Sequence, residues 1–363
     1  MTDTILHLTE NISFASGGVR PVLINLNNYI NKNFADKKSV IITNHKEPLD
    51  TFLEFKSYKF KSWYYSNELK QYLESYIVEN MGYHLHGVFM HTQFIPSKIA
   101  KKNNVPFVIS PHGMLEPWHL NDKKLKKSIY LNLFLKEILK SSKILHAITP
   151  LEKENLYQLT NHKNIFEIPN FIVFDDVPKS FSYNNKEEDY LLFLGRLHPK
   201  KGLDIIIEAM TKIVDKKIKL KIVGAENTYS ENIKKKCASL GLLNRVEFTG
   251  SVYGDEKYKL FSQAKAFLAP SFSEAIGMVN LEAAACKTPV LTTYNTGLNP
   301  AWNSNGGVLI NPLVHELVTA INAITSWTTS EREERGLALS NFVLTNYSWE
   351  KKGYLWDELY NTL

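Results

Sequence analysis

The sequence has 363 residues, of which 44% are hydrophobic and 22% are charged, and its formal net charge is +6 at pH 7. This composition is ordinary for a soluble globular enzyme and excludes fibrous and disordered chains, while the length suggests two domains. Cys237 and Cys286 are too few for a disulfide framework or a thiolate metal site. Because no apolar run is long enough to span a membrane and the start lacks a signal-peptide pattern, we expect a cytoplasmic protein.

Short apolar runs alternate with helical patterns along the first half of the chain. The predicted strands cover residues 5–8, 40–43, 84–90, 107–110 and 144–149, and residues 52–60 could form a further strand. The predicted helices cover residues 19–31, 66–78, 97–103 and 125–139. The pattern pauses near Ile168, and the polar segment 180–189 is typical of a linker.

The alternation restarts after this segment. Strands are predicted at 190–194, 220–223, 246–248, 266–268 and 289–292, with helices at 203–214, 230–240, 256–264 and one ending near Cys286. Such alternation implies parallel sheets with right-handed crossovers. We therefore predict an α/β protein of two Rossmann-like domains facing a central cleft, where ligands bind outside the carboxyl ends of the strands. The first domain would span 1–175 with a returning helix at about 346–363, and the second 185–345.

The segment 271–290 carries the densest pattern of functional residues. Glu274 follows a predicted strand, and a helix is expected to begin near Gly277. The amides of Gly277, Met278 and Val279 would then be free donors at a helix N-terminus, which favours anions. Glu274 could accept hydrogen bonds from sugar hydroxyls, and Glu282 could reach a ribose diol. Two solvated glutamates on a helix are the simpler alternative.

A second candidate site lies in the turn after strand 190–194. Arg196 and Lys201 stand there between Gly195 and Gly202, where an Arg fork and a Lys point charge could hold a diphosphate, with Lys200 as an exposed neighbour. Loops collect basic residues in any case, so this pattern alone is weak.

Two further turns follow predicted strands in the first domain. Gly17 and Gly18 would allow the backbone to approach a ligand closely, although a plain tight turn is equally consistent and a full G-x-G-x-x-G is absent. His112, directly after strand 107–110, could donate to a phosphate or a sugar hydroxyl, or could only cap the local backbone.

Three other histidines stand close together in the sequence. His84, His86 and His91 have no cysteine or carboxylate at a spacing that suits zinc, so no metal site is predicted. No Walker loop, G-x-S-x-G elbow or H-E-x-x-H motif is present, which removes support for those hydrolase and NTPase classes.

Taken in order, these motifs resemble the retaining glycosyltransferases of group 1, family four, which have the GT-B fold. The matching pieces are Ser16-Gly17-Gly18, Pro111-His112-Gly113, Ile168-Pro169-Asn170, Gly195-Arg196-Leu197, Lys200-Lys201-Gly202, Glu274 with Glu282, and the closing Tyr347-Ser348-Trp349-Glu350. Two residues depart from the family pattern, because Ala275 and Phe171 stand where glycine is usual.

The resemblance implies roles for these residues. Arg196 and Lys201 would hold the diphosphate of a nucleoside-diphosphate sugar, Glu274 would bind the donor sugar and Glu282 the ribose. Gly17, Gly18 and His112 would approach the reacting phosphate and sugar from the first domain. The implied reaction retains the anomeric configuration and needs no metal or other cofactor.

The segment 111–127 resembles bacterial enzymes that build O-antigen, capsule or exopolysaccharide on polyprenyl-diphosphate-linked acceptors. Ten lysines lie from Lys98 to Lys143, and those that follow Met114, Leu115 and Trp118 could form with them a contact surface for the inner face of an anionic membrane. A solvated helix face is the alternative, and no nucleic-acid motif accompanies the lysines.

Other functions remain open on the sequence alone. A nucleotide-sugar epimerase or a sugar phosphorylase could share the architecture, and a non-catalytic scaffold subunit of a polysaccharide assembly complex is a further possibility. The sequence indicates neither the nucleotide, the sugar, the acceptor nor the oligomeric state.

Overall fold

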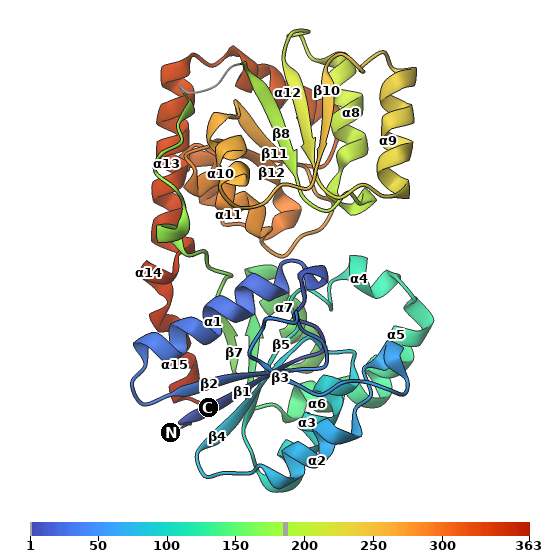
Figure 1. The fold of residues 1–363 in the computed structure, drawn as a ribbon, viewed down its shortest axis with the longest axis vertical. Helices are drawn as coiled ribbons and strands as arrows, with labels where there is room; N and C mark the ends of the chain where they lie inside the picture. The colour runs from blue at the N-terminus through green and yellow to red at the C-terminus, as the bar shows by residue number, and fades with distance from the viewer. Residues whose placement is uncertain (1, 184–187) are drawn as a thin grey trace. The chain divides into compact units, whose positions relative to one another are not determined.

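The computed structural model describes residues 2–183 and 188–363, and the chain divides into two compact units (Figure 1). Unit 1 comprises Met1–Asn170 and Gly353–Leu363, and unit 2 comprises Phe171–Lys352. The sequence analysis placed these boundaries at 175, 185 and about 346. Part of the expected linker, 184–187, lies outside the described residues. No helix of the described ranges is long and apolar enough to cross a membrane.

Unit 1 is built on a parallel sheet of seven strands in the order β3-β2-β1-β4-β5-β6-β7. The strands are β1 (Thr4–Thr9), β2 (Lys38–Thr43), β3 (Leu53–Glu54), β4 (Met81–His86), β5 (Phe107–Ser110), β6 (Ile144–Ala147) and β7 (Ile165–Glu167). Successive side chains of a strand point to opposite faces of a sheet. Leu8 and Leu85, which are paired in register, therefore lie in the apolar core of one face, whereas the paired His7 and His84 lie on the other.

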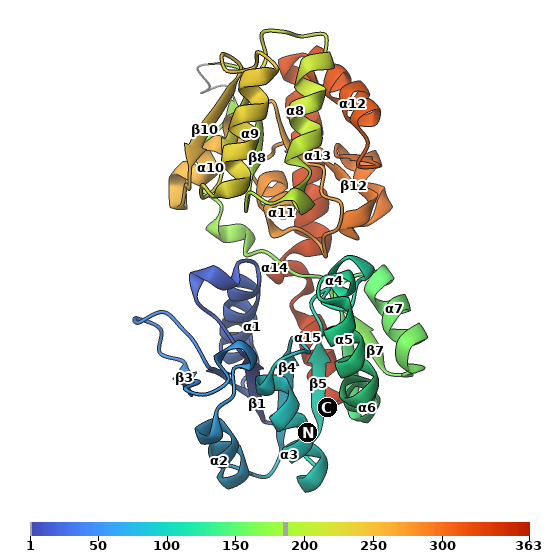
Figure 2. The same cartoon turned by 90° about the vertical axis from the view of Figure 1, so that its right-hand side faces the viewer.

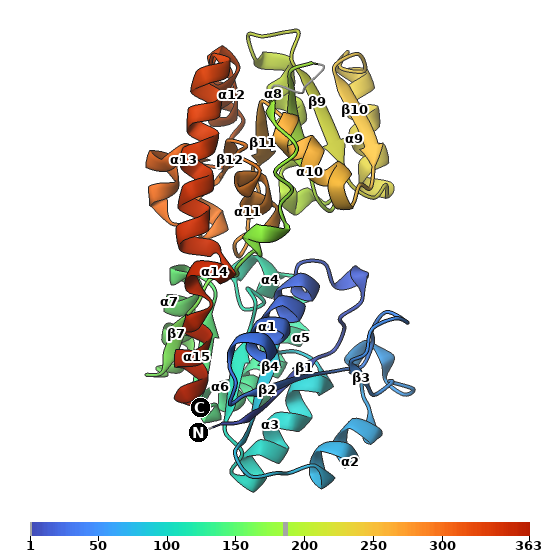
Figure 3. The same cartoon turned by 60° about the vertical axis from the view of Figure 1, so that its left-hand side comes forward.

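Helices cover both faces of this sheet. The apolar core is closed by α2 (Asn67–Ser75), α3 (His91–Asn103), α6 (Lys136–Ser141) and α7 (Pro150–Thr160). On the face that carries the histidines lie α1 (Val19–Asn33) and the returning helix α15 (Tyr354–Asn361), which run near each other in Figures 1 and 3. Trp356 and Tyr360 of α15 are buried, and the Trp356 ring lies 4.7 Å from that of His146.

The segment that follows Asn170 runs beside the end of the long helix α13 (Thr329–Tyr347). Ile172 donates its N–H to the Tyr347 carbonyl at 2.9 Å and accepts from the Trp349 N–H at 3.1 Å. Phe171 is buried with its ring edge-on to Trp349, at 5.3 Å between centroids. The phenylalanine that stands in place of the usual glycine is thus a packing residue.

Unit 2 is built on a parallel sheet of six strands in the order β10-β9-β8-β11-β12-β13. The strands are β8 (Tyr190–Leu194), β9 (Lys219–Val223), β10 (Val246–Gly250), β11 (Ala266–Ala269), β12 (Val290–Thr293) and β13 (Val308–Ile310). One face packs against α8 (Leu203–Lys212), α9 (Thr228–Ser239) and α12 (Val314–Ser326), as Figure 2 shows. The other elements include α10 (Gly254–Gln263), α11 (Met278–Ala285) and α13, and the short α14 (Trp349–Lys352) follows.

Some predicted elements were wrong in extent. The strand expected at 84–90 is β4 and ends at His86, because Gly87 turns left-handed with φ +88°. The helix expected from residue 97 begins at His91, where the Met90 N–H is held by Gln93, and it contains Pro96. The helix expected at 125–139 is split into α5 (Lys124–Tyr130), a π-helical turn at Leu131–Leu135 and α6. Only Leu53–Glu54 of the segment 52–60 forms a strand.

Candidate functional site

Every turn singled out in the sequence lies in the segment between the carboxyl end of a parallel strand and the next element. Gly17 and Gly18 follow β1, and His112 follows β5 in unit 1. In unit 2, Arg196 and Lys201 follow β8, and the turn that begins at Ser271 follows β11. Ligands of parallel α/β sheets bind at this edge, so each unit carries its candidate residues where chemistry is expected.

Two turns of unit 2 are packed against each other through backbone. Gly202 adopts a left-handed conformation with φ +73°, and a Cβ atom there would lie 2.1 Å from the Pro270 carbonyl oxygen. The Phe272 N–H also donates to the Lys200 carbonyl at 2.9 Å. Glycine is therefore required at 202 because the two backbones touch.

This contact brings the predicted Lys201 and Glu274 together. The Lys201 Nζ forms an ion pair with the Glu274 carboxylate, and the two side chains are 24% and 20% exposed. Arg196 is exposed on the same loop, whereas Lys200, expected to be exposed, is half-buried. A cation and a carboxylate thus stand side by side, partly exposed, and could meet the charged and hydroxyl groups of one ligand.

The turn then leads into α11 as the sequence predicted. Gly277 is the N-cap, so helix geometry leaves the first-turn amides, including those of Met278 and Val279, without acceptors inside the helix. Ile276 has φ +46°, an uncommon backbone conformation for a β-branched residue, and its N–H is held by the Thr296 carbonyl at 2.9 Å. Ala275 does not have a positive φ, so its methyl group costs no backbone strain.

Glu282 lies on α11 and has a partner that the sequence analysis missed. Its Oε1 is 3.0 Å from the Nζ of Lys257 on α10, and the two side chains are 24% and 20% exposed. Lys257 therefore orients the carboxylate that is predicted to bind a ribose. No sequence signal marks this pair, because 25 residues separate its members.

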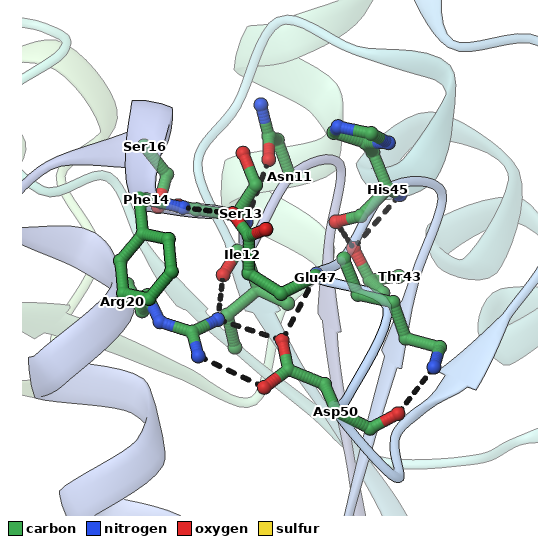
Figure 4. Close-up of polar contacts among 11 residues, drawn as sticks. Asn11, Ile12, Ser13, Phe14, Ser16, Arg20, Thr43, His45, Glu47 and Asp50 are labelled. Atoms are coloured by element: carbon green, nitrogen blue, oxygen red, sulfur yellow. Dashed lines mark hydrogen bonds and ion pairs between the residues drawn. The ribbon is translucent and has the colours of Figure 1, made fainter.

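In unit 1 the glycine turn is tied to the loop that follows β2 (Figure 4). The Arg20 guanidinium donates to both carboxylate oxygens of Asp50 at 2.7 and 2.8 Å, and the Phe14 N–H donates to Glu47 at 2.7 Å. Gly17 has φ +64°, and a Cβ atom at Gly18 would meet nothing within 4 Å. The turn is thus fixed in shape and open at Gly18, while the charge of Arg20 is already compensated by Asp50.

His112 is held by the backbone of its own turn. It has φ +54°, Gly113 has φ +74°, and the Gly113 N–H donates to the Glu152 Oε1 at 2.7 Å. Glu152 is buried and also accepts from the Ile148 N–H at 2.8 Å, and burial raises the pKa of its carboxyl to about 7. The sequence analysis missed Glu152, although Thr149 three residues earlier completes a helix-start signature.

His112 belongs to a cluster of five histidines on one face of the sheet. They are His7 of β1, His84 and His86 of β4, His112 and His146 of β6. Burial lowers the pKa of His7 and His112 to about 3 and that of His146 to about 4, and holds those of His84 and His86 well below the ordinary value. All five imidazoles are therefore neutral near pH 7.

Three of these rings come close enough to raise the question of a metal ion. One nitrogen each of His7, His84 and His86 lies within 4.8 Å of the others. The His7 Nδ1 is only 2.9 Å from the His86 Nε2, however, and the His84 and His86 rings are stacked at 4.0 Å. A hydrogen bond between these two nitrogens occupies the proton of one and the lone pair of the other, so hydrogen bonding accounts for this geometry better than a metal does.

Comparison with known proteins connects these features to one enzyme class. Residues 177–335, less than half of the chain, match the family model described as glycosyl transferases group 1. An uncharacterized glycosyltransferase of Methanocaldococcus jannaschii is 35% identical over 112 residues, which cover 31% of this chain and 29% of the relative. A second from that organism is 28% identical over 230 residues, covering 61% and 59%. The chain thus matches less than two thirds of the length of either relative.

Solved structures are similar over the whole chain. Anabaena HepE in complex with UDP and glucose has a TM-score of 0.78 at 17% identity, covering 99% of this chain and 100% of that one. WaaG, a glycosyltransferase involved in lipopolysaccharide biosynthesis, has a TM-score of 0.73 at 16% identity, covering 99% and 98%. These likenesses show that the chain has the GT-B fold of two Rossmann-like domains, and with the family match they support a glycosyltransferase of group 1.

The first prediction concerns the Arg20–Asp50 pair. Arg20→Lys cannot form two parallel hydrogen bonds to a carboxylate, so we expect the free energy of unfolding to fall by about 1–2 kcal/mol in urea titrations. Lys101→Gln is the control, because its pair with Glu137 is more than half exposed and should contribute less than about 0.5 kcal/mol. Equal losses in the two variants would contradict a special role for the Arg20 fork.

The second prediction concerns pH. The five clustered histidines and His91, whose pKa burial lowers to about 4, have folded-state pKa values below the unfolded value near 6.5. The unfolded chain therefore binds more protons below pH 6.5, and stability is lost as the pH falls. Burial also raises the pKa of Glu152 to about 7 and raises that of Glu10, and both carboxyls oppose this effect.

Near pH 5.5 unfolding of unit 1 should thus take up about four to five protons, equivalent to roughly 6 kcal/mol per pH unit. Urea titrations at pH 7.5, 6.5 and 5.5 would measure the change. An unfolding free energy that stays constant over this range would show that the histidines are not held neutral.

Proposed function

We propose that the protein is a retaining glycosyltransferase that moves a sugar from a UDP- or GDP-linked donor to a hydroxyl group of a glycan acceptor. The observation that carries this proposal is the meeting of the 195–202 and 270–277 turns. It sets Lys201, Glu274 and the N-terminus of α11 at one edge of the unit 2 sheet. The HepE complex with UDP-glucose, a similar fold, supports a nucleotide-sugar donor.

The chemistry follows from where charge develops. When the bond between the anomeric carbon and the diphosphate oxygen breaks, negative charge grows on the leaving group and the sugar becomes oxocarbenium-like. Arg196, Lys201 and the first amides of α11 would stabilise that negative charge. Such donors are effective because they are already oriented and do not have to reorganise as the charge develops. These groups can supply the stabilisation that a metal gives elsewhere, so we propose a metal-independent reaction.

Retention of configuration requires attack on the face from which the diphosphate leaves. We propose that the acceptor oxygen bonds to the anomeric carbon on this face while its proton passes to the departing phosphate oxygen. In this scheme no carboxylate becomes covalently attached to the sugar. Glu274 would instead accept hydrogen bonds from donor-sugar hydroxyls, and Glu282, oriented by Lys257, from the ribose.

We further propose a polyprenyl-diphosphate-linked acceptor in bacterial O-antigen, capsule or exopolysaccharide synthesis, at the cytoplasmic face of the membrane. The fold likeness to WaaG gives this proposal its context. A stripe of exposed apolar residues supports a membrane contact. Leu125, Ile129 and Leu133, spaced by four residues, are 77%, 52% and 64% exposed along α5 and the π-helical turn.

Lysines surround this stripe, with exposed side chains at Lys123, Lys124 and Lys126. An apolar face with basic flanks fits the interface of an anionic bilayer. The surface differs from the one expected from sequence, because Leu115 is buried and Met114 is half-buried. Trp118, 44% exposed at the start of α4 (Pro117–Asn121), stays part of it.

Two rival functions make different predictions. An epimerase would convert the nucleotide-sugar without any acceptor, so product analysis in the absence of acceptor separates it from a transferase. A scaffold subunit should bind neither UDP nor GDP in calorimetric titration. A panel of nucleotide-sugars screened by thermal shift would identify the donor, because a bound ligand raises the melting temperature.

The third prediction tests the diphosphate site. Arg196→Ala and Lys201→Ala should each lower kcat for transfer by about 10²–10³-fold, with unchanged circular dichroism, because each removes a donor to the leaving group. Lys235→Ala removes the same charge from an exposed site on α9 and serves as the control. Near-normal turnover of both test variants would contradict the proposed function.

The fourth prediction tests the membrane surface by vesicle flotation. The protein should float with phosphatidylglycerol vesicles at low salt and be released at high salt, and the triple change of Leu125, Ile129 and Leu133 to Gln should abolish flotation. Val214 and Leu243, 80% and 64% exposed in unit 2, changed to Gln provide the control. Failure of the unaltered protein to float would remove the membrane proposal and leave the transfer reaction untouched.

A further inference from the structure

The five clustered histidines form two hydrogen-bonded chains, and the direction of the first can be worked out. The His146 Nε2 lies 2.8 Å from the Ile168 carbonyl oxygen, which can only accept, so this nitrogen carries the proton. The neutral ring then has a bare Nδ1, which accepts from the Ser110 hydroxyl at 2.7 Å. The Ser110 oxygen in turn accepts from the next ring along the chain.

That next ring is His84, whose Nε2 lies 2.6 Å from the Ser110 oxygen and must donate to it. The His84 Nδ1 is therefore bare and accepts from the Tyr360 hydroxyl at 2.7 Å. Every ring nitrogen of His84 and His146 thus has a partner. This chain ends in backbone and in the α15 helix, and none of its bonds reaches His112.

The second chain runs from His7 through His86 to His112. The His7 Nδ1 is 2.9 Å from the His86 Nε2, and the His86 Nδ1 is 2.9 Å from the His112 Nε2. Each neutral ring has one proton, so the three rings must donate in the same direction. The His7 Nε2 is buried without a hydrogen-bond partner among the described residues.

This orphan nitrogen decides the direction. If the rings donated inward, His7 would bury an N–H with no acceptor, whereas outward donation leaves only a bare nitrogen there. Orphaned buried N–H groups are the rarer and costlier of the two. The outward direction makes His7 donate to His86 and His86 donate to the His112 Nε2, so the His112 proton must sit on Nδ1.

We propose that His86, held in turn by His7, is a positioning residue that fixes His112 as its Nδ1–H form and aims that N–H at an oxygen of the substrate. His112 is only half-buried, and its Nδ1 is not among the buried unpaired atoms of the described residues. The proposal rests on the proposed function for the identity of the substrate, whose phosphate oxygens can only accept. A bare nitrogen at that point could not bind them.

The first test reads the tautomer directly and needs no substrate. In protein labelled with ¹⁵N-histidine, two-bond correlation spectra at pH 7.5 should show His112 protonated on Nδ1. In His86→Phe this preference should be lost. His84→Phe is the matched control, since His84 lies two residues away on the same strand and face, is equally buried and bonds to the other chain.

The second test is kinetic. His86→Phe should lower kcat/KM about tenfold or more, as expected for loss of a hydrogen bond to a charged group. His84→Phe should stay within about twofold of the unaltered enzyme, and His86→Asn, whose amide can donate from nearly the same point, should recover part of the loss. In a His112→Ala background His86→Phe should have no further effect.

The outcomes separate this proposal from the proposed function. An Nε2–H form of His112 in the unaltered protein, or equal kinetic losses in His86→Phe and His84→Phe with comparable thermal stability, would overturn the positioning role. Absence of transfer with every donor would contradict the proposed function, while the tautomer spectra would still decide how His112 is held.

Discussion

The close approach of two backbone turns in unit 2 is the constraint on which the candidate donor site depends. A Cβ atom at Gly202 would overlap the Pro270 carbonyl, so only glycine lets the turn after β8 reach the turn after β11. The hydrogen bond from the Phe272 N–H to the Lys200 carbonyl then sets the register between them. Lys201 and Glu274 meet as a consequence, and the N-terminus of α11 follows within a few residues. The backbone, more than any single side chain, brings the charged groups together.

Unit 1 is subject to a different constraint, because it buries polar imidazole rings against one face of its sheet. A buried polar group without a partner destabilises a fold, so each imidazole must be neutral and hydrogen-bonded. The alternation of side chains along β1 and β4 places His7, His84 and His86 on one face, where His7 bonds to His86 and His84 bonds to Ser110 and Tyr360. The arrangement holds His112 through its hydrogen bond with His86, and it carries a cost in stability at acid pH. That cost is expected where a site needs a fixed hydrogen-bond donor.

Much of the fold was predictable from local pattern, whereas contacts between distant segments were not. The strands β5 and β8 were predicted to the residue, because each is a short apolar run bounded by turn residues. The strand at β4 was misplaced because the apolar run continues past Gly87. Lys201 and Glu274 were foreseen as separate motifs, but their pairing, like that of Arg20 with Asp50, depends on packing between segments far apart in sequence. The hydrogen-bonded histidine chains could not be predicted from the sequence for the same reason, because their residues come from four different strands.

The returning helix α15 covers the histidine cluster of unit 1. Tyr360 donates to His84 and the Trp356 ring packs over His146, so the helix removes water from the histidine face. Without that cover the rings could take up protons, and charged imidazoles 4–5 Å apart would repel one another. When the imidazoles are uncharged, each ring carries a single N–H. The hydrogen bonds between the rings then have a defined donor direction. The C-terminal segment, remote in sequence from the turn at His112, thus helps to keep the histidine cluster uncharged, which is the condition that the proposed donor role of His112 requires.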